Sequence, residues 1–403
     1  MRPDRIALTD RWVAKPLCAV FSLFERVRRL WTRPALEEPR RIVFVKLIEM
    51  GSTVIACPAF AEAEKLVGRE NLFILVFAPN RPILEVLPYF RPENVITVDD
   101  RNILAFAVGL LRALFRVWRE KIDTAIDMEG LTSSSALITY LTRAPRRVGY
   151  YNFSSQGPYR GRLLTHELNY GFQHHVSRQF VALVRAAAGK GADVPLLKER
   201  IQDEVIELPE FVPTSAAREE VRALLREEAG ADPKQLLLLN PNCSDLLPLR
   251  RWSDERWVEL GKRLLEELPD ATIAVTGAPS EAEQAARIAQ AIGCERAFSA
   301  AGRTSLQQLL VLYGLSDLLV SNDSGPVHFA ALTPVPVVAL FGPETPLLYG
   351  PLSRRARVLH AGLACSPCVN ILNHRMSPCT DNQCMQRITV EDALAAAREL
   401  LAV

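Results

Sequence analysis

The most constraining feature of the sequence is a twice-repeated alternation of short apolar runs with segments of helical periodicity. The first half carries apolar runs at residues 42–47, 71–79, 94–100 and 122–128. The second half carries them at residues 236–240, 271–277, 317–323 and 336–342. Short apolar strands that alternate with helices are typical of a parallel sheet covered on both faces. We therefore predict an α/β protein with two doubly wound domains.

This pattern divides the 403 residues into four parts. We expect a basic amphipathic arm at residues 1–40, a first α/β domain at 41–190, a linker with an entry helix at 191–235 and a second α/β domain at 236–403. The linker segment is rich in Pro and charged residues and has no buried-strand run. Because ligands of open sheets bind beyond the carboxyl ends of the strands, we expect a ligand site in a cleft between the two halves.

Basic residues are concentrated at the beginning of the chain. Residues 1–41 carry ten Arg and Lys against five Asp and Glu, whereas the formal net charge of the whole chain is only +2. This balance gives no support to nucleic-acid binding. Within the arm, residues 16–31 have apolar side chains at helical spacing, which predicts a helix on an anionic membrane surface or one docked on the protein's own core. Residues 102–121 read as a core helix.

Two absences in the sequence bear on where the protein acts. No apolar run reaches the roughly 18 to 20 residues that span a bilayer. The N-terminus also lacks the pattern of a signal peptide. We therefore expect a cytoplasmic protein, with peripheral contact to the inner leaflet of the cytoplasmic membrane as the role of the basic arm.

The loop at residues 321–328, with the sequence SNDSGPVH, follows an apolar strand and begins a helix. Free N–H groups and the helix dipole at such a start favour a phosphate, here beside Ser324 and Gly325. Asp323 is placed to cap the helix, and His328 lies about one turn further on. The alternative is that these residues are ordinary caps and a core histidine. Three other strand ends carry polar or Gly residues, at 48–52, 240–245 and 276–281.

The segment from Asn322 to Pro346, NDSGPVHFAALTPVPVVALFGPETP, closely resembles the C-terminal signature of glycosyltransferase family 9, the ADP-heptose:lipopolysaccharide heptosyltransferases. The resemblance extends from about Arg41 to the end of the chain and includes VKLIEMGSTVIACPAF, RVGYYNF and RRWSDERWVELGKRL. It implies a GT-B fold, with two Rossmann-like domains and a nucleotide-sugar bound mainly by the second.

The resemblance also implies roles for individual residues. Ser324, Gly325 and neighbouring amides would meet the diphosphate, and Arg250 would stabilise its departure. Gly277 and Glu281 would hold the nucleoside. The predicted substrate-binding residues are Gly51, Ser52, Asn242, Gly277, Glu281, Asp323, Ser324, Gly325 and Pro326, and the predicted catalytic residues are Glu49, Arg250 and His328.

The first loop departs from the family pattern. Many members have MGD there, and its Asp is the proposed general base, whereas this chain has Ser52 at that position. A Ser hydroxyl has no useful basicity near neutral pH, so we predict that Glu49 supplies the carboxylate. The alternatives are that Glu49 is merely solvated and the chain binds without transferring, or that Asp127 or Glu129 acts instead. The mechanism requires no metal.

Four of the eight cysteines lie in one segment, residues 365–384, with the spacing C-x2-C-x10-C-x4-C. Two close pairs can supply four thiolates to structural zinc or iron. The predicted ligands are Cys365, Cys368, Cys379 and Cys384. Disulfides are the alternative. The segment is similar to Cys-rich insertions of autotransporter heptosyltransferases, whose finger holds iron.

From the residues and the resemblance together we predict an inverting glycosyltransferase. It would transfer heptose or a related sugar from ADP-heptose or another NDP-sugar to a saccharide acceptor, which we expect to be lipid-linked and of the lipopolysaccharide core type. Two alternatives are a protein O-heptosyltransferase, which the four cysteines favour, and a non-catalytic nucleotide-sugar-binding protein, which Ser52 favours.

Overall fold

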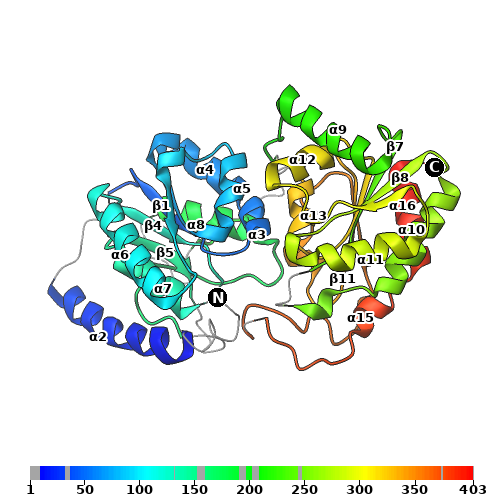
Figure 1. The fold of residues 1–403 in the computed structure, drawn as a ribbon. Helices are drawn as coiled ribbons and strands as arrows, with labels where there is room; N and C mark the ends of the chain where they lie inside the picture. Colours follow the sequence, from blue (N-terminus) through cyan, green and yellow to red (C-terminus); the bar gives the residue numbers. More distant parts are fainter. Residues whose placement is uncertain are drawn as a thin grey trace. The chain divides into compact units, whose positions relative to one another are not determined.

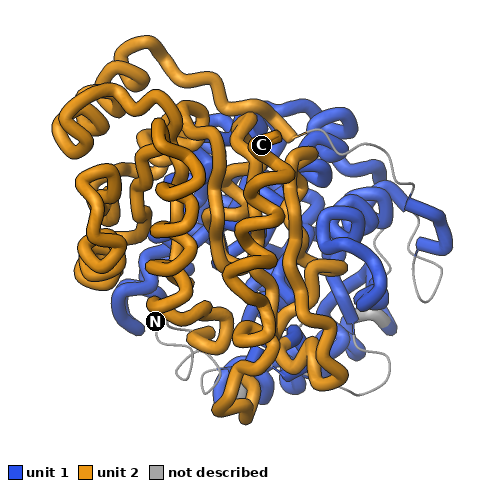
Figure 2. The backbone as a smooth tube through the Cα atoms, turned by 90° about the vertical axis from the view of Figure 1, so that its right-hand side faces the viewer, with its two compact units in different colours: residues 1–207, 370–375 blue, residues 208–369, 376–403 orange. Residues whose placement is uncertain are grey.

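A computed structural model describes residues 10–31, 37–130, 132–151, 159–189, 197–201, 208–243, 247–373 and 375–402, without the side chains of Arg11 and Arg29. The chain forms two compact units, shown in different colours in Figure 2. Unit 1 comprises residues 1–207 and 370–375, and unit 2 comprises residues 208–369 and 376–403. No helix within the described ranges is both long and apolar enough to cross a membrane.

Unit 1 is built on a six-stranded sheet with the order β3-β2-β1-β4-β5-β6 (Figure 1). The strands are β1 (Ile42–Val45), β2 (Leu72–Phe77), β3 (Val95–Val98), β4 (Thr124–Asp127), β5 (Arg146–Tyr150) and β6 (His166–Leu168). All neighbouring strands pair in parallel. Strand order reverses between β1 and β4, where Val45 lies opposite Asp127. In doubly wound sheets this reversal marks the crevice where ligands bind.

Helices cover both faces of this sheet. They are η1 (Asp10–Ala14), α2 (Lys15–Trp31), α3 (Met50–Ile55), α4 (Cys57–Val67), α5 (Arg81–Val86), α6 (Ile103–Arg119), α7 (Ser133–Leu141) and α8 (Val176–Ala188). Helix α4 packs against α8, while α2 packs against α7. Strands β1 and β2 are apolar throughout because both of their faces are buried. Val43, Val45, Leu75 and Ala125 form part of the resulting core.

Unit 2 repeats this architecture with the strand order β12-β11-β10-β7-β8-β9. Its strands are β7 (Gln235–Asn240), β8 (Ala271–Val275), β9 (Ala297–Ser299), β10 (Leu318–Asn322), β11 (Val337–Phe341) and β12 (Ala356–His360). All pairs are again parallel. The reversal of strand order falls between β7 and β10. Their carboxyl ends are therefore the place to look for a ligand site.

The helices of unit 2 are α9 (Ser215–Ala229), α10 (Asp254–Glu267), α11 (Ala282–Ile292), α12 (Leu306–Gly314), α13 (Gly325–Ala330), α14 (Pro346–Tyr349), α15 (Gln383–Gln386) and α16 (Val390–Leu401). Trp257 of α10 is fully buried in the apolar core of this unit. The prediction of an α/β protein with two doubly wound sheets is confirmed.

Candidate functional site

Polar side chains collect at the carboxyl edge of the unit 2 sheet. Glu344 follows β11, Asp323 follows β10, Asn242 follows β7 and Gly277 follows β8. These four strands are consecutive neighbours in the sheet. Because all are parallel, their carboxyl ends lie along one edge. The structure thus brings the three predicted loops of this unit to one edge, together with Glu344, which was not predicted.

Arg250 joins the two acidic side chains of this edge. Its Nε lies 3.2 Å from Oδ2 of Asp323, and its Nη2 lies 3.6 Å from Oε2 of Glu344. Its Nη1 also donates to the main-chain oxygen of Asp323 at 3.3 Å. Asp323 is 2% exposed and Glu344 is fully buried. Arg250 Nε, Asp323 Oδ2 and Glu344 Oε2 have no hydrogen-bond partner within the described part of the chain.

One guanidinium therefore faces two buried carboxyl groups. Burial raises the pKa of Glu344 to about 8, an effect that Arg250 opposes and Asp323 reinforces. Burial also raises the pKa of Asp323, and Arg250 again opposes the shift. Near neutral pH one carboxyl of this cluster consequently keeps its proton. Buried groups with shifted pKa values and unused polar atoms are characteristic of functional sites.

Helix α13 begins beside this cluster. Its N-cap residue, Ser324, is extended (φ −157°, ψ 179°) and makes no side-chain cap. Instead its Oγ donates to the main-chain oxygen of Asn322 at 3.2 Å. The expectation that Asp323 caps this helix was wrong, because its carboxylate is turned to Arg250. No side chain therefore caps the first turn of α13. Pro326 has no N–H and the N–H of Val327 donates to the main-chain oxygen of Ser324 at 3.3 Å, so the N–H of Gly325 is the first donor at this helix start.

Two further residues of the loop are fixed in place. The predicted catalytic residue His328 lies in α13 and is 7% exposed. Asn322, which was not predicted, donates from Nδ2 to the main-chain oxygen of Pro241 at 2.7 Å. Its Oδ1 accepts from the N–H of Trp252 at 3.4 Å. Asn322 therefore ties the end of β10 to the loop after β7, across the point where strand order reverses.

Asn242, Gly277 and Glu281 also come together at this edge. A Cβ atom at Gly277 would lie 2.7 Å from Nδ2 of Asn242 and 3.2 Å from Glu281. Only glycine allows this close approach. Glu281 Oε2 accepts from the N–H of Ala278 at 2.6 Å, so this carboxylate orders the turn η6 (Pro279–Glu281). The three residues predicted to hold the nucleoside or its surroundings are thus neighbours in the structure.

In unit 1, Asp127 and Glu129, the two alternatives to Glu49 as the base, make buried structural contacts. Glu129 Oε1 lies 3.2 Å from Nζ of buried Lys46 and accepts from the N–H of Leu47 at 2.6 Å. Asp127 forms an ion pair with Arg160, and both side chains are fully buried. Burial lowers the pKa of Lys46, while Glu129 opposes this shift. These carboxylates are engaged in structural contacts, which leaves Glu49 as the accessible acid of the first loop.

Glu49 occupies an unusual backbone conformation for a residue with a side chain (φ 68°, ψ 91°). Its main-chain oxygen accepts from Oγ of Ser52 at 3.0 Å and from the N–H of Thr53 at 3.1 Å. Its carboxylate, 35% exposed, forms an ion pair with Arg375, which belongs to the same unit. Left-handed conformations of this kind cost of order 1–3 kcal/mol and cluster at functional sites. Gly51 and Ser52, which follow Glu49 in α3, are buried.

None of the four cysteines predicted to bind a metal is in a disulfide. Cys365 and Cys379 are exposed, Cys368 is intermediate and Cys384 is buried. The Sγ of Cys368 accepts from Oγ of Ser377 at 3.2 Å. Burial raises the pKa of the Cys384 thiol, and Cys368 and Cys379 act in the same direction. Among the described residues no group of three or more His, Cys, Asp or Glu could hold a metal ion. Metal binding here stays a prediction.

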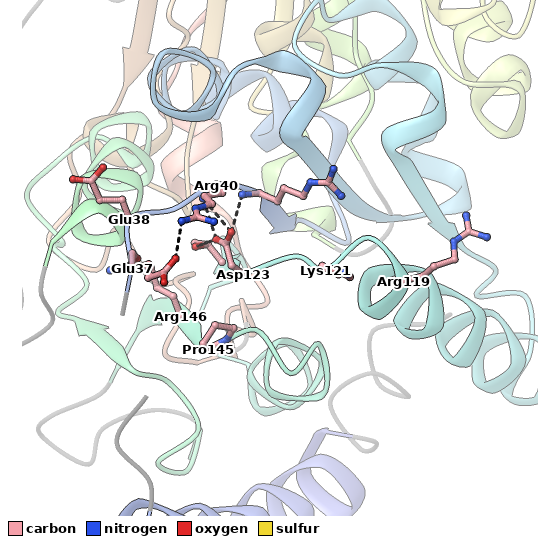
Figure 3. A pocket seen from close by; sticks show the side chains of 10 residues that line it. Glu37, Glu38, Arg40, Arg119, Lys121, Asp123, Pro145 and Arg146 are labelled. Atoms are coloured by element: carbon pink, nitrogen blue, oxygen red, sulfur yellow. Dashed lines mark hydrogen bonds and ion pairs between the residues drawn. The ribbon is translucent and has the colours of Figure 1, made fainter. Parts of the chain in front are cut away.

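Two surface pockets are lined by other residues. One, of about 620 Å³, lies in unit 1 at the opposite edge of its sheet, where Thr124 begins β4 and Arg146 begins β5 (Figure 3). The other, of about 490 Å³, lies beside the start of α10 and includes Trp252. The lining of neither pocket includes a predicted site residue. Neither pocket therefore bears on the predicted chemistry.

The chain is similar to known heptosyltransferases. Residues 111–377 match glycosyltransferase family 9 (heptosyltransferase). The chain is 27% identical over 298 residues to lipooligosaccharide heptosyltransferase 2 of Haemophilus influenzae, which covers 72% of this chain and 80% of that protein.

Solved structures share the fold. That of the E. coli ADP-heptose lipopolysaccharide heptosyltransferase II has a TM-score of 0.65 at 20% identity and covers 90% of this chain and 98% of its own. That of the E. coli heptosyltransferase WaaC with ADP-2-deoxy-2-fluoro heptose has a TM-score of 0.61 at 18% identity. The match covers 89% of this chain and 99% of the WaaC chain. The two parallel six-stranded sheets are thus those of a GT-B-like structure. Since the family match spans well over half of its length, the chain belongs to glycosyltransferase family 9, the heptosyltransferases.

Proposed function

We propose that this glycosyltransferase transfers heptose from ADP-heptose to a hydroxyl group of a lipid-linked saccharide, with inversion at the anomeric carbon. The observation that carries the donor half of this proposal is the cluster of Arg250, Asp323 and Glu344 beside the uncapped start of α13. It lies where strand order reverses in unit 2, which is where doubly wound sheets bind nucleotides. The solved complex of WaaC contains an ADP-sugar analogue.

Unit 2 would bind the donor through three groups of atoms. The first-turn N–H groups of α13 and the guanidinium of Arg250 would meet the diphosphate. Asn242, Gly277 and Glu281 would hold the nucleoside at the neighbouring strand ends. The carboxyl that keeps its proton would donate a hydrogen bond to the donor, since a second buried carboxylate would repel a diphosphate. His328, one turn into α13, would position the same groups.

Unit 1 would supply the base. Glu49 would take the proton of the acceptor hydroxyl, whose oxygen would then attack the anomeric carbon as the bond from that carbon to the diphosphate breaks. The products are the glycoside and ADP, with the proton on Glu49. Ser52 cannot take this role because its hydroxyl is turned to a main-chain oxygen. None of the eight cysteines is in a disulfide, which is consistent with a reducing cytoplasm.

The test is release of ADP from ADP-heptose, with and without a lipopolysaccharide core precursor that lacks heptose. We expect acceptor-dependent release by the wild type. Glu49→Gln should lower kcat by about 10² or more, the usual contribution of a general base, and leave the Kd for ADP unchanged. Glu85→Gln is the matched control, because Glu85 is an exposed acid of unit 1 paired only with Arg81 along its helix.

The outcomes separate the parts of the proposal. Failure of the wild type to bind ADP-heptose would refute the donor site. Full activity of Glu49→Gln would refute the base and leave the donor site standing. Transfer to a polypeptide instead of the core precursor would refute the acceptor class.

A further inference from the structure

Helix α2 lies on unit 1 with small and polar side chains inward. Among the described side chains of η1 and α2, the buried ones are the small Ala14 and Cys18 and the polar Asp10, Ser22 and Glu25, of which Asp10 and Glu25 are 4% and 1% exposed. Large apolar side chains point outward instead, with Leu23 66%, Phe24 63% and Trp31 84% exposed. A helix on the surface of a water-soluble protein normally turns its apolar stripe toward the core. The orientation of α2 is the reverse of that arrangement.

Specific polar contacts fix this orientation. The Asp10 carboxylate accepts from the N–H of Ser134 at 2.7 Å, at the start of α7. Ser22 Oγ accepts from the N–H of Arg162 at 2.7 Å. Glu25 forms a buried ion pair with Arg147 at 3.0 Å. Turning α2 over would break all three contacts and take the Glu25 carboxylate away from the buried Arg147, which is strongly unfavourable. The outward apolar face is thus a fixed feature of the unit.

A second helix exposes a similar stripe. Helix α6 packs one face on the sheet, where Leu114 is 3% exposed. On its outer face Leu104 is 75%, Leu111 65% and Phe115 64% exposed. These positions follow helical spacing, so they form one continuous stripe. The expectation that residues 102–121 form a core helix therefore holds for only one face of α6.

The two helices flank the same neighbour. Helix α2 packs against α7, and Nε1 of Trp118 in α6 donates to the main-chain oxygen of Leu141 at the end of α7 at 3.0 Å. In Figure 1 α2, α6 and α7 lie on one side of the unit 1 sheet. We call the outward faces of α2 and α6 the α2/α6 surface.

The charges of the α2/α6 surface all have one sign. Helix α6 contains no Asp or Glu, and the single acid of α2 is the buried Glu25. Among the described side chains of these helices, Lys15, Arg26, Arg112 and Arg119 are exposed cations. Exposed apolar residues with cations and without acids are the pattern of helices that lie in the boundary of an anionic bilayer. A second copy of the same surface would bring like charges together.

We propose that the α2/α6 surface docks unit 1 on an anionic lipid bilayer. Its apolar side chains enter the boundary between headgroups and acyl chains, and its arginine and lysine side chains meet lipid phosphates. Trp31 of α2 and Trp118 of α6, which are 84% and 36% exposed, stand at this boundary, the position that Trp prefers in membranes. The inference rests on unit 1 alone and goes beyond the transfer reaction.

The first test uses the full chain and vesicles of phosphatidylcholine, alone or mixed with phosphatidylglycerol. Sedimentation with the vesicles should be at least about tenfold tighter for the anionic mixture, because each basic side chain near the surface contributes about fivefold. Brominated lipids should quench part of the tryptophan emission of the wild type. Equal binding to both vesicle types, or no quenching in the bound protein, would overturn the proposal.

The second test removes the apolar side chains. The double variants Leu23→Ser/Phe24→Ser and Leu111→Ser/Phe115→Ser should each weaken binding to anionic vesicles at least about tenfold, since each loses two side chains of the kind that enter the boundary. Val212→Ser, at an 80% exposed apolar position of unit 2, is the matched control and should bind as the wild type. Unchanged binding of both double variants would overturn the proposal.

Two controls separate this surface from the catalytic proposal and from self-association. ADP release with a delipidated, water-soluble acceptor should be unchanged in the double variants, so loss of vesicle binding cannot be mistaken for loss of the active site. Sedimentation equilibrium of the wild type and of both double variants should give the same oligomeric state. An oligomer that these substitutions dissociate, without vesicle binding by the wild type, would overturn the proposal in favour of a second copy as the occupant.

Discussion

Glu344→Gln should remove a pH-dependent loss of stability from unit 2. Burial raises the pKa of Glu344 from 4.5 to about 8 in the folded protein. Between these values the folded protein holds a proton that the unfolded chain has released, so the free energy of unfolding falls as the pH rises. The stabilisation is complete below pH 4.5 and is lost as the pH rises through 8. Gln has no such proton, so the variant lacks this dependence.

The size of the effect follows from the shift. A difference of one bound proton changes the free energy of unfolding by about 1.4 kcal/mol per pH unit. From pH 6 to pH 8 the slope flattens as the folded protein begins to titrate, which leaves a change of about 2 kcal/mol. The free energy of unfolding of Glu344→Gln minus that of the wild type should increase by this amount over the interval.

Urea unfolding at pH 6, 7 and 8 measures this difference. Emission of Trp252 and Trp257, which are 2% and 0% exposed, reports on unit 2. Glu283→Gln is the control, because the Glu283 side chain is 91% exposed and pairs only with Arg287. A difference that stays constant within about 0.5 kcal/mol, the range of ordinary surface substitutions, would refute a proton held at Glu344.

Two further predictions concern unit 1. Arg375→Gln should lower kcat about tenfold, because the guanidinium that pairs with and positions the Glu49 carboxylate is gone; Arg375→Lys should restore most of the activity, and an unchanged kcat would show that the ion pair does not matter. Arg160→Met should destabilise unit 1 by about 3–5 kcal/mol, since it leaves Asp127 buried and unpaired. In a thermal melt Arg160→Met/Asp127→Leu should recover most of that loss, whereas a double variant no more stable than the single one would contradict the argument.

The sequence predicts the centre of each sheet better than its edges. Strands β1, β2, β7, β8, β10 and β11 are continuous apolar runs, because helices bury both of their faces. Among the edge strands, β3 was predicted, whereas β6, β9 and β12 were not; β6 and β9 are only three residues long. β5 was not predicted either, because it begins with Arg146 and Arg147, whose burial depends on contacts such as those with Glu37 and Glu25, far away in the sequence.

The same limit applies to the candidate site. Ser324, Gly325 and Gly277 could be chosen from the sequence because a strand end followed by a helix start is a local signal. Glu344 also lies in a loop that follows an apolar strand, two residues after Gly342 in FGPETP. This loop position was the signal from which it could have been predicted. Its importance depends on Arg250, which is 94 residues away in sequence and meets it only in the folded sheet edge. Ion pairs between distant residues leave no trace in local periodicity.

The segment between Cys368 and Cys379 connects two features that the sequence presents as separate. Residues 370–375 belong to unit 1, whereas the cysteines on either side belong to unit 2. Arg375 in this segment forms the ion pair with Glu49, and Ile371 lies where a Cβ atom at Gly130 would be 3.1 Å from it. Whatever fixes the two cysteines also restricts the positions that Arg375 can take, because only a few residues separate them. The four-cysteine segment is therefore linked to the proposed base, Glu49, through the side chain of Arg375. This link requires no metal in the reaction itself.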